Sequence, residues 1–343
     1  MWISIIEIVS FIALVFYIIF GGADYGAGIL EFFKPNKIRK IDTEIEHIIN
    51  KAIGPVWEAN HIWLILIIVI LFNGFPELFL TLTTYLHLPL VAVLLGIVLR
   101  GVAFTFRHYD IFEGRPIKLY TRIFSFSSLW TGLWLGIIAG AVILGRIDPN
   151  AKDVYHLYIH PWFNYFCLSV GIFITSVFTY IASSFLIGET DNLLIKNYFR
   201  QRSLVANIIV IISGGAVFLT AQYEGFFLMQ KFFNNNFSIA MMILATICWS
   251  CQEFFKKSMT FLARRVLVVG QVVFILLGFF FVQAPTMISL TTKQLTMSNT
   301  AAPEATLIQL VVALIVGLFL IIPSLLYLFW IFKFKQEEIT NEN

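Results

Sequence analysis

The chain consists of long, uninterrupted apolar runs that are separated by short polar connections. A helix needs about 20 mostly apolar residues to cross the hydrocarbon core of a bilayer. We therefore predict an all-α polytopic membrane protein, with one integral membrane domain over residues 1–343 and nine transmembrane helices. The predicted spans are 2–20, 56–74, 77–99, 123–144, 162–187, 204–222, 236–254, 266–283 and 306–331.

Charge is scarce and unevenly distributed. Charged residues make up 13% of the chain, against about 25% in soluble proteins. Nineteen of the 23 Lys and Arg residues follow the odd-numbered spans, and the other four are Arg146, Lys152, Lys231 and Lys293. Basic loops stay in the cytoplasm. The distribution predicts an N-terminus outside the cell and a cytoplasmic C-terminus.

An acid lies about one turn inside the second predicted span, at Glu58. Ionisable groups cost roughly 2.5–3.5 kcal/mol at the centre of a membrane helix, so they usually serve an ion path or a buried pair. His61 is three residues away and shares a helix face with Glu58. The other polar and aromatic residues of the segment are Trp57, Asn60 and Trp63. Two interpretations stay open: a proton path through Glu58, His61 and Asn60, or an acid that caps or pairs near the membrane surface.

The end of the first span combines an acid with several glycines. Asp24 lies in the segment FGGADYGAGIL, beside Gly21, Gly22, Gly26 and Gly28. Small residues let a second helix approach closely, so the glycines predict tight packing at a loosened helix end. We expect Asp24 to pair with Arg100 or Arg107 on the same side of the membrane.

Two arginines, Arg100 and Arg107, are seven residues apart and project from one helix face. A lone arginine at a helix end usually extends its charge to the interface, which is the favoured interpretation of Arg100. The alternative is a fixed positive charge that pairs with Asp24 or Glu58, or that holds a propionate or head group of a neighbour.

The histidines do not predict a cofactor site. At 1.5 Å of rise per residue, His61 is expected roughly 8 Å from the inner face and His87 roughly 15 Å from it. Ligands of one haem would lie at the same depth. The sequence shows neither paired histidines nor a cluster of metal ligands. We expect this chain to ligate no haem and no metal.

Taken together, these motifs resemble subunit II of the bd-type cytochrome quinol oxidases. The first family element is matched by Gly22, Asp24, Gly26 and Gly28. The second is matched by Trp57, Glu58, Asn60, Ile62 and Trp63. The third is matched by Arg100, Phe104 and Arg107, and a loop before the last helix is matched around residues 285–306. The region from about 145 to 280 matches only in hydropathy.

The resemblance implies two four-helix bundles plus one peripheral helix. It implies a complex with a haem-bearing subunit I that carries haems b and d, oxidises quinol and reduces oxygen. It also implies a prokaryotic inner membrane, and that Glu58 begins a proton path from the cytoplasm. Small accessory subunits and a bound quinone or lipid are left open, and no nucleic acid is expected.

Two other classes of function compete with this interpretation. A secondary transporter would use Glu58 as its proton-coupled acid, but such proteins usually show broken helices near the midplane and related halves, and no convincing repeat is visible. A purely structural membrane scaffold is the second alternative. Co-purification with a haem-bearing subunit would argue against the transporter. The effect of a Glu58→Gln change on activity would test the scaffold interpretation.

Overall fold

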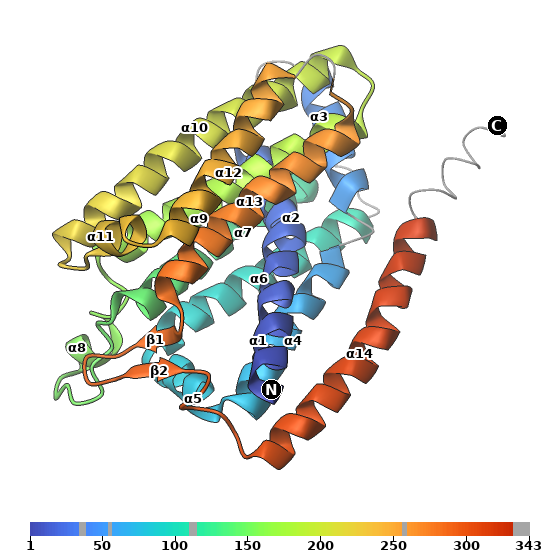
Figure 1. Cartoon of the computed structure of the whole chain (residues 1–343). Helices are drawn as coiled ribbons and strands as arrows, with labels where there is room; N and C mark the ends of the chain where they lie inside the picture. Colours follow the sequence, from blue (N-terminus) through green and yellow to red (C-terminus); the bar gives the residue numbers. More distant parts are fainter. Residues whose placement is uncertain (34–38, 54–56, 110–114, 256–258, 332–343) are drawn as a thin grey trace.

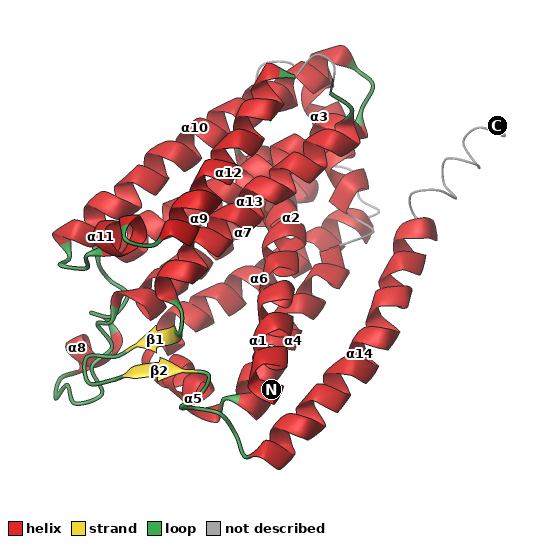
Figure 2. Ribbon diagram, viewed as in Figure 1, coloured by secondary structure: helices red, strands yellow, loops and turns green. Residues whose placement is uncertain are grey.

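The computed structural model describes residues 1–33, 39–53, 57–109, 115–255 and 259–331. Within these ranges, eight helices are long and apolar enough to cross a membrane, and a bent helix pair brings the number to nine. The helices run side by side through most of the molecule, and one short pair of strands lies at one end (Figure 2). These features confirm the all-α membrane fold.

The described residues of the N-terminal half form seven α-helices and one π-helical turn. They are α1 (Trp2–Phe16), η1 (Tyr17–Gly21), α2 (Gly22–Phe32), α3 (Arg39–Ile53), α4 (Trp57–Gly74), α5 (Pro76–Tyr85), α6 (His87–Tyr109) and α7 (Arg115–Leu144). Helix α3 precedes the second predicted span.

The C-terminal half adds seven α-helices, a 3₁₀ turn and two strands. They are α8 (Val154–Tyr158), α9 (Tyr165–Leu186), η2 (Ile187–Glu189), α10 (Leu193–Tyr223), α11 (Leu228–Phe233), α12 (Asn236–Phe254), α13 (Phe261–Gln283), β1 (Thr286–Ser289), β2 (Gln294–Thr296) and α14 (Glu304–Trp330).

The long helices form two groups that meet at α9. In the first group α1 packs on α4, α6 packs on α7, and α2 packs on α7. In the second group α9 packs along α10, and α12 packs along α13. Helix α9 also contacts α2 and α7, and most of its side chains are buried. Helix α14 lies against α1 and α4 at the side of the molecule (Figure 1).

The first span is longer than predicted. Helices α1 and α2 form one apolar rod from Trp2 to Phe32, joined through the π-helical turn. The expectation of a loosened helix end at the glycines is wrong, because Gly22 to Gly28 lie within regular α-helix. This extension carries Asp24 and Glu31 into the packed interior.

The third span begins ten residues later than predicted. Pro76 starts α5, which lies at 114° to α4, and α6 begins only at His87. The residue before a proline is restricted away from the helical region, and Phe75 accordingly has φ −139° and ψ 64°. The prediction of 77–99 failed because residues on both sides of this corner are apolar. Arg100 therefore lies inside α6 rather than at its end.

The two ends of the molecule differ in structure. The N-terminus lies at the same end as α5, α8 and the strands, and α3 lies at the opposite end (Figure 1). Part of the loop between α13 and α14 forms the antiparallel pair β1–β2. The Nζ atom of Lys293 in this hairpin lies 2.5 Å from the Oε1 atom of Glu77 on α5.

Candidate functional site

A buried ion pair joins α2 to α6. The guanidinium of Arg100 donates to the carboxylate of Asp24 and, over 3.0 Å, to the Asp24 carbonyl oxygen. Both residues are 4% exposed. The interpretation of Arg100 as an interfacial side chain is therefore wrong, and the alternative pairing with Asp24 is correct. A buried pair of this kind requires good geometry to offset the loss of water.

A second pair lies seven residues further along both helices. Arg107 donates to both carboxylate oxygens of Glu31, over 2.9 and 3.0 Å, and also to the side-chain oxygen of Asn50 on α3. The Arg107 and Glu31 side chains are 5% and 0% exposed. Both contacts to Glu31 come from Nη1, while Nη2 donates to Asn50, and charge-assisted bonds of this kind are stronger than neutral ones. We refer to the two pairs, Asp24–Arg100 and Glu31–Arg107, as the charge ladder.

One aromatic ring connects the two pairs. The guanidinium carbons of Arg100 and Arg107 lie 4.8 and 4.6 Å from the ring centre of Phe124 on α7. Arg100 also lies 4.5 Å from the ring of Tyr25, whose hydroxyl is 3.4 Å from that of Tyr17. Cations gain energy over aromatic faces, particularly where water is excluded. The rings thus hold both cations within the bundle.

The glycines of α2 give its neighbours room. A Cβ atom on Gly26 would overlap the carbonyl oxygen of Phe178 on α9, and one on Gly28 would overlap the Ser128 side chain on α7. The Phe178 ring lies 2.7 Å from the Cβ position of Gly22. The predicted close helix packing is confirmed. Helix α2 therefore packs closely between α7 and α9, and this packing excludes water from Asp24.

Among the predicted residues of α4, His61 lies near the charge ladder. Asn60 is 3% exposed, and His61, which is half-buried, lies within electrostatic range of both Asp24 and Arg100. The ring of Trp63 is tilted against that of Phe16 on α1, with 4.6 Å between the ring centres, which is a packing role. The side chains of Trp57 and Glu58 lie outside the described residues, so the proton path through Glu58 stays a prediction.

The structure also corrects the depth assigned to His87. This residue starts α6, its Nδ1 is 2.8 Å from the Thr84 carbonyl oxygen, and its ring meets Tyr158 of α8 edge-on at 5.0 Å. It therefore lies near the end of the molecule that carries α8 and the strands, not in the middle of a span. No group of three or more His, Cys, Asp or Glu residues in the described ranges has metal-binding geometry.

Sequence reasoning missed Glu31, Asn50 and Tyr25. A signal for Glu31 was present, because Asp24 and Glu31 have the same seven-residue spacing as Arg100 and Arg107. Each acid is 76 residues from its arginine. Matched spacings on two helices indicate two parallel pairs. The span ending at residue 20 placed Glu31 in a loop, which hid this pattern.

Comparisons with known proteins agree on the family. A family model described as cytochrome bd terminal oxidase subunit II matches residues 2–332. Cytochrome bd ubiquinol oxidase subunit 2 of Bacillus subtilis (strain 168) is 28% identical over 156 residues, which is 45% of this chain and 44% of the relative. Cytochrome bd-I ubiquinol oxidase subunit 2 of Escherichia coli (strain K12) is 28% identical over 181 residues, 50% of this chain and 45% of the relative.

The fold has a solved counterpart. A chain of the bd oxidase from Geobacillus thermodenitrificans superposes with a TM-score of 0.77 at 21% identity, over 97% of this chain and 99% of that one. The alignments to the two curated relatives span less than half of their length, whereas the family model covers nearly all of this sequence. The chain therefore belongs to the cytochrome bd terminal oxidase subunit II family.

Proposed function

We propose that this chain is a membrane subunit of a quinol oxidase that reduces oxygen to water. The observation that carries the proposal is the family match over residues 2–332. In this proposal a haem-bearing subunit I holds haems b and d, oxidises quinol and binds oxygen, and any small accessory subunits attach to that pair. The present chain supports subunit I in the inner membrane of a prokaryote.

We further propose that the chain delivers protons through Glu58, with Asn60 and His61 along the path. Reduction of oxygen consumes one proton for each electron, and the bilayer blocks direct access to a buried haem. The buried Asn60 and the nearby charge ladder support this role, because they extend a polar region into the membrane beside α4. Two nitrogens of Arg100, Nε and Nη1, are buried without a hydrogen-bond partner among the described residues, so they can donate hydrogen bonds to water along the path.

The haem content of the isolated chain tests the proposal that the partner subunit, and not this chain, ligates the haems. We expect the chain expressed without a partner to show no haem absorbance, and the complex purified through a tag on this chain to show it. The reason is that its histidines are too few and lie at unequal depths for haem ligation. The measurement is a reduced-minus-oxidised spectrum of both preparations. A haem signal that stays with the isolated chain through purification contradicts this expectation.

Orientation is tested separately. We propose an outer N-terminus and a cytoplasmic C-terminus, because nineteen of the 23 basic residues follow odd-numbered spans. A reporter that is active only in the cytoplasm, fused after Asn343, is expected to be active. A periplasm-specific reporter at the same position is expected to be inactive. The opposite pattern would mean that the nine-span topology is wrong.

A further inference from the structure

Two buried tyrosines place adjoining hydroxyl groups beside the charge ladder. Tyr17 belongs to the π-helical turn η1 and Tyr25 to α2, and they are 4% and 0% exposed. Their hydroxyl oxygens lie 3.4 Å apart, and either group can donate to the other. A tyrosine hydroxyl both donates and accepts hydrogen bonds. The two hydroxyls therefore form a short chain of groups that can exchange protons inside the bundle.

The π-helical turn brings the two hydroxyls together. An α-helix turns by about 100° per residue, so two side chains eight residues apart point about 80° away from each other. The π-helical turn at Tyr17–Gly21 takes up one extra residue, because its hydrogen bonds join residues five apart. Tyr17 and Tyr25 therefore share one face, as residues seven apart do in an α-helix. Such turns are rare and occur frequently at functional sites.

Packing holds both phenol rings in place. A Cβ atom on Gly21 would lie 3.2 Å from the Tyr17 ring, so glycine at this position gives the ring its space. The Tyr25 ring stacks on that of Phe178 on α9, with 5.9 Å between the ring centres. Because the rings are confined, the main freedom left to the two side chains is rotation of their O–H bonds.

The tyrosine pair lies between the charge ladder and α4. The guanidinium carbon of Arg100 is 4.5 Å from the centre of the Tyr25 ring, and both tyrosines lie within electrostatic range of Asp24 and Arg100. Helix α4 packs against the π-helical turn that contains Tyr17. His61 of α4 also lies within electrostatic range of Asp24. The hydroxyls are thus placed next to both parts of the proposed proton path.

We propose that Tyr25 and Tyr17 form a proton relay that connects the charge ladder to the polar residues of α4. Each hydroxyl oxygen accepts a proton and releases its own proton to the next group, so one O–H bond forms as another breaks. The charge moves on, and both tyrosines stay neutral. Rotation of the two O–H groups then resets the relay. This inference rests on the proposed function, because it assumes that the chain delivers protons.

Tyr17→Phe and Tyr25→Phe test the relay. Phenylalanine keeps the ring and removes only the hydroxyl, so both variants are expected to assemble. Complexes of equal haem content are assayed for oxygen uptake with excess quinol, in H₂O and in D₂O. We expect each variant to be about tenfold slower than the parent, because water bridges the missing hydroxyl only in part. The ratio of the rates in H₂O and D₂O is expected to rise, because proton transfer then limits turnover.

The double variant Tyr17→Phe with Tyr25→Phe adds a second criterion. If both hydroxyls serve one relay, the first break already interrupts it. We therefore expect the double variant to be no slower than the slower of the two single variants.

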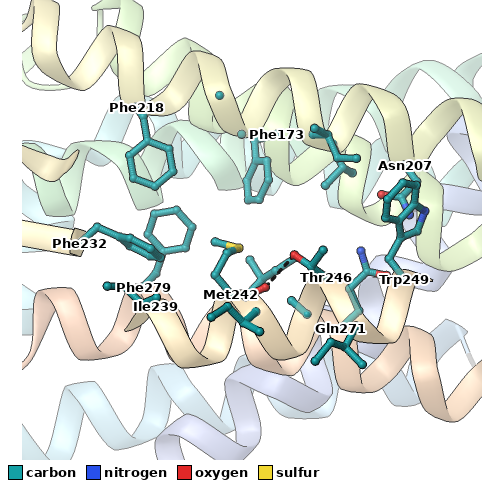
Figure 3. Close-up of a pocket in the computed structure, with 18 of the residues that line it drawn as sticks. Phe173, Asn207, Phe218, Phe232, Ile239, Met242, Thr246, Trp249, Gln271 and Phe279 are labelled. Atoms are coloured by element: carbon teal, nitrogen blue, oxygen red, sulfur yellow. Dashed lines mark hydrogen bonds between the residues drawn. The ribbon is translucent and has the colours of Figure 1, made fainter. Parts of the chain in front are cut away.

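Tyr180→Phe is the matched control. Tyr180 is 3% exposed, and its hydroxyl donates to Gln252 and Gln271 over 2.9 and 2.7 Å. These residues belong to the second helix group, where Gln271 lines a pocket between α10 and α12 (Figure 3). The control therefore removes a buried tyrosine hydroxyl that is not part of the relay, and its complex is expected to keep the parent rate and the parent isotope ratio.

The Glu58→Gln complex separates failure of the relay from failure of the proposed function. Parent rates in both tyrosine variants, together with a slow Glu58→Gln complex, would overturn the relay and leave proton delivery in place. Parent rates in all three complexes would overturn both. Slow tyrosine variants with an unchanged isotope ratio, or a Tyr180→Phe complex that is equally slow, would show that the hydroxyls matter for packing, and the relay would be wrong.

Discussion

Complexes carrying Glu58→Gln are expected to assemble with full haem content but to consume oxygen at least about tenfold more slowly than the parent. Glutamine keeps the shape and hydrogen bonding of the side chain and removes the titrating proton. A positioned acid or base typically contributes 10²–10⁴-fold to a proton-transfer step. The measurement is oxygen uptake with excess quinol, on purified complexes of equal haem content.

Three variants sharpen this test. Glu58→Asp is expected to retain more activity, because only reach is lost. His61→Ala is expected to have a smaller effect, since water can bridge the gap. Glu77→Gln is the matched control, because Glu77 lies on α5 and pairs with Lys293 of the hairpin. If the Glu58→Gln complex respires at the parent rate, Glu58 is a structural acid and the scaffold interpretation gains support.

Removing one partner of the Asp24–Arg100 pair is expected to destabilise the chain. Arg100→Met leaves the Asp24 carboxylate buried without its cation, and breaking a buried pair in this way costs about 3–5 kcal/mol. We expect little folded complex from this variant, and a lower melting temperature for what is recovered. The measurements are complex yield from membranes and thermal unfolding in detergent.

The double variant Asp24→Leu with Arg100→Met separates charge from packing. Replacing both members by apolar residues is often neutral, so we expect the double variant to recover most of the yield lost in Arg100→Met. Asp191→Asn is the control, because Asp191 forms an exposed pair with Lys196, and such pairs contribute little. A double variant as unstable as the single one would show that Arg100 matters through other contacts.

The sequence predicted the architecture well because bilayer thickness dictates it. Apolar runs such as 236–254 coincide with their helices, here α12 (Asn236–Phe254). Hydropathy did not predict the helix boundaries at Pro76 and His87, because it measures how apolar a segment is and not the direction in which its helix runs. A helix that turns by 114° has the same composition as one that continues.

The candidate site was predictable in part. Asp24 was expected to pair with Arg100 or Arg107 because buried charges inside a membrane usually pair, but the favoured interpretation placed Arg100 at the interface. The choice between Arg100 and Arg107 depended on where α2 ends and where α6 begins, and both boundaries were misplaced. The Phe124 ring between the two arginines has no local sequence signal, because a contact between distant helices depends on tertiary packing.

The charge ladder also restricts how the helices can move. Both of its pairs connect α2 to α6 with the same spacing, so a slide of either helix by one turn, about 5.4 Å, would break both pairs at once. Each cation would then face apolar side chains instead of a carboxylate. The two ion pairs therefore resist sliding of α2 past α6 along the membrane normal. Any rearrangement of the first helix group has to leave both α2–α6 pairs intact or break them together.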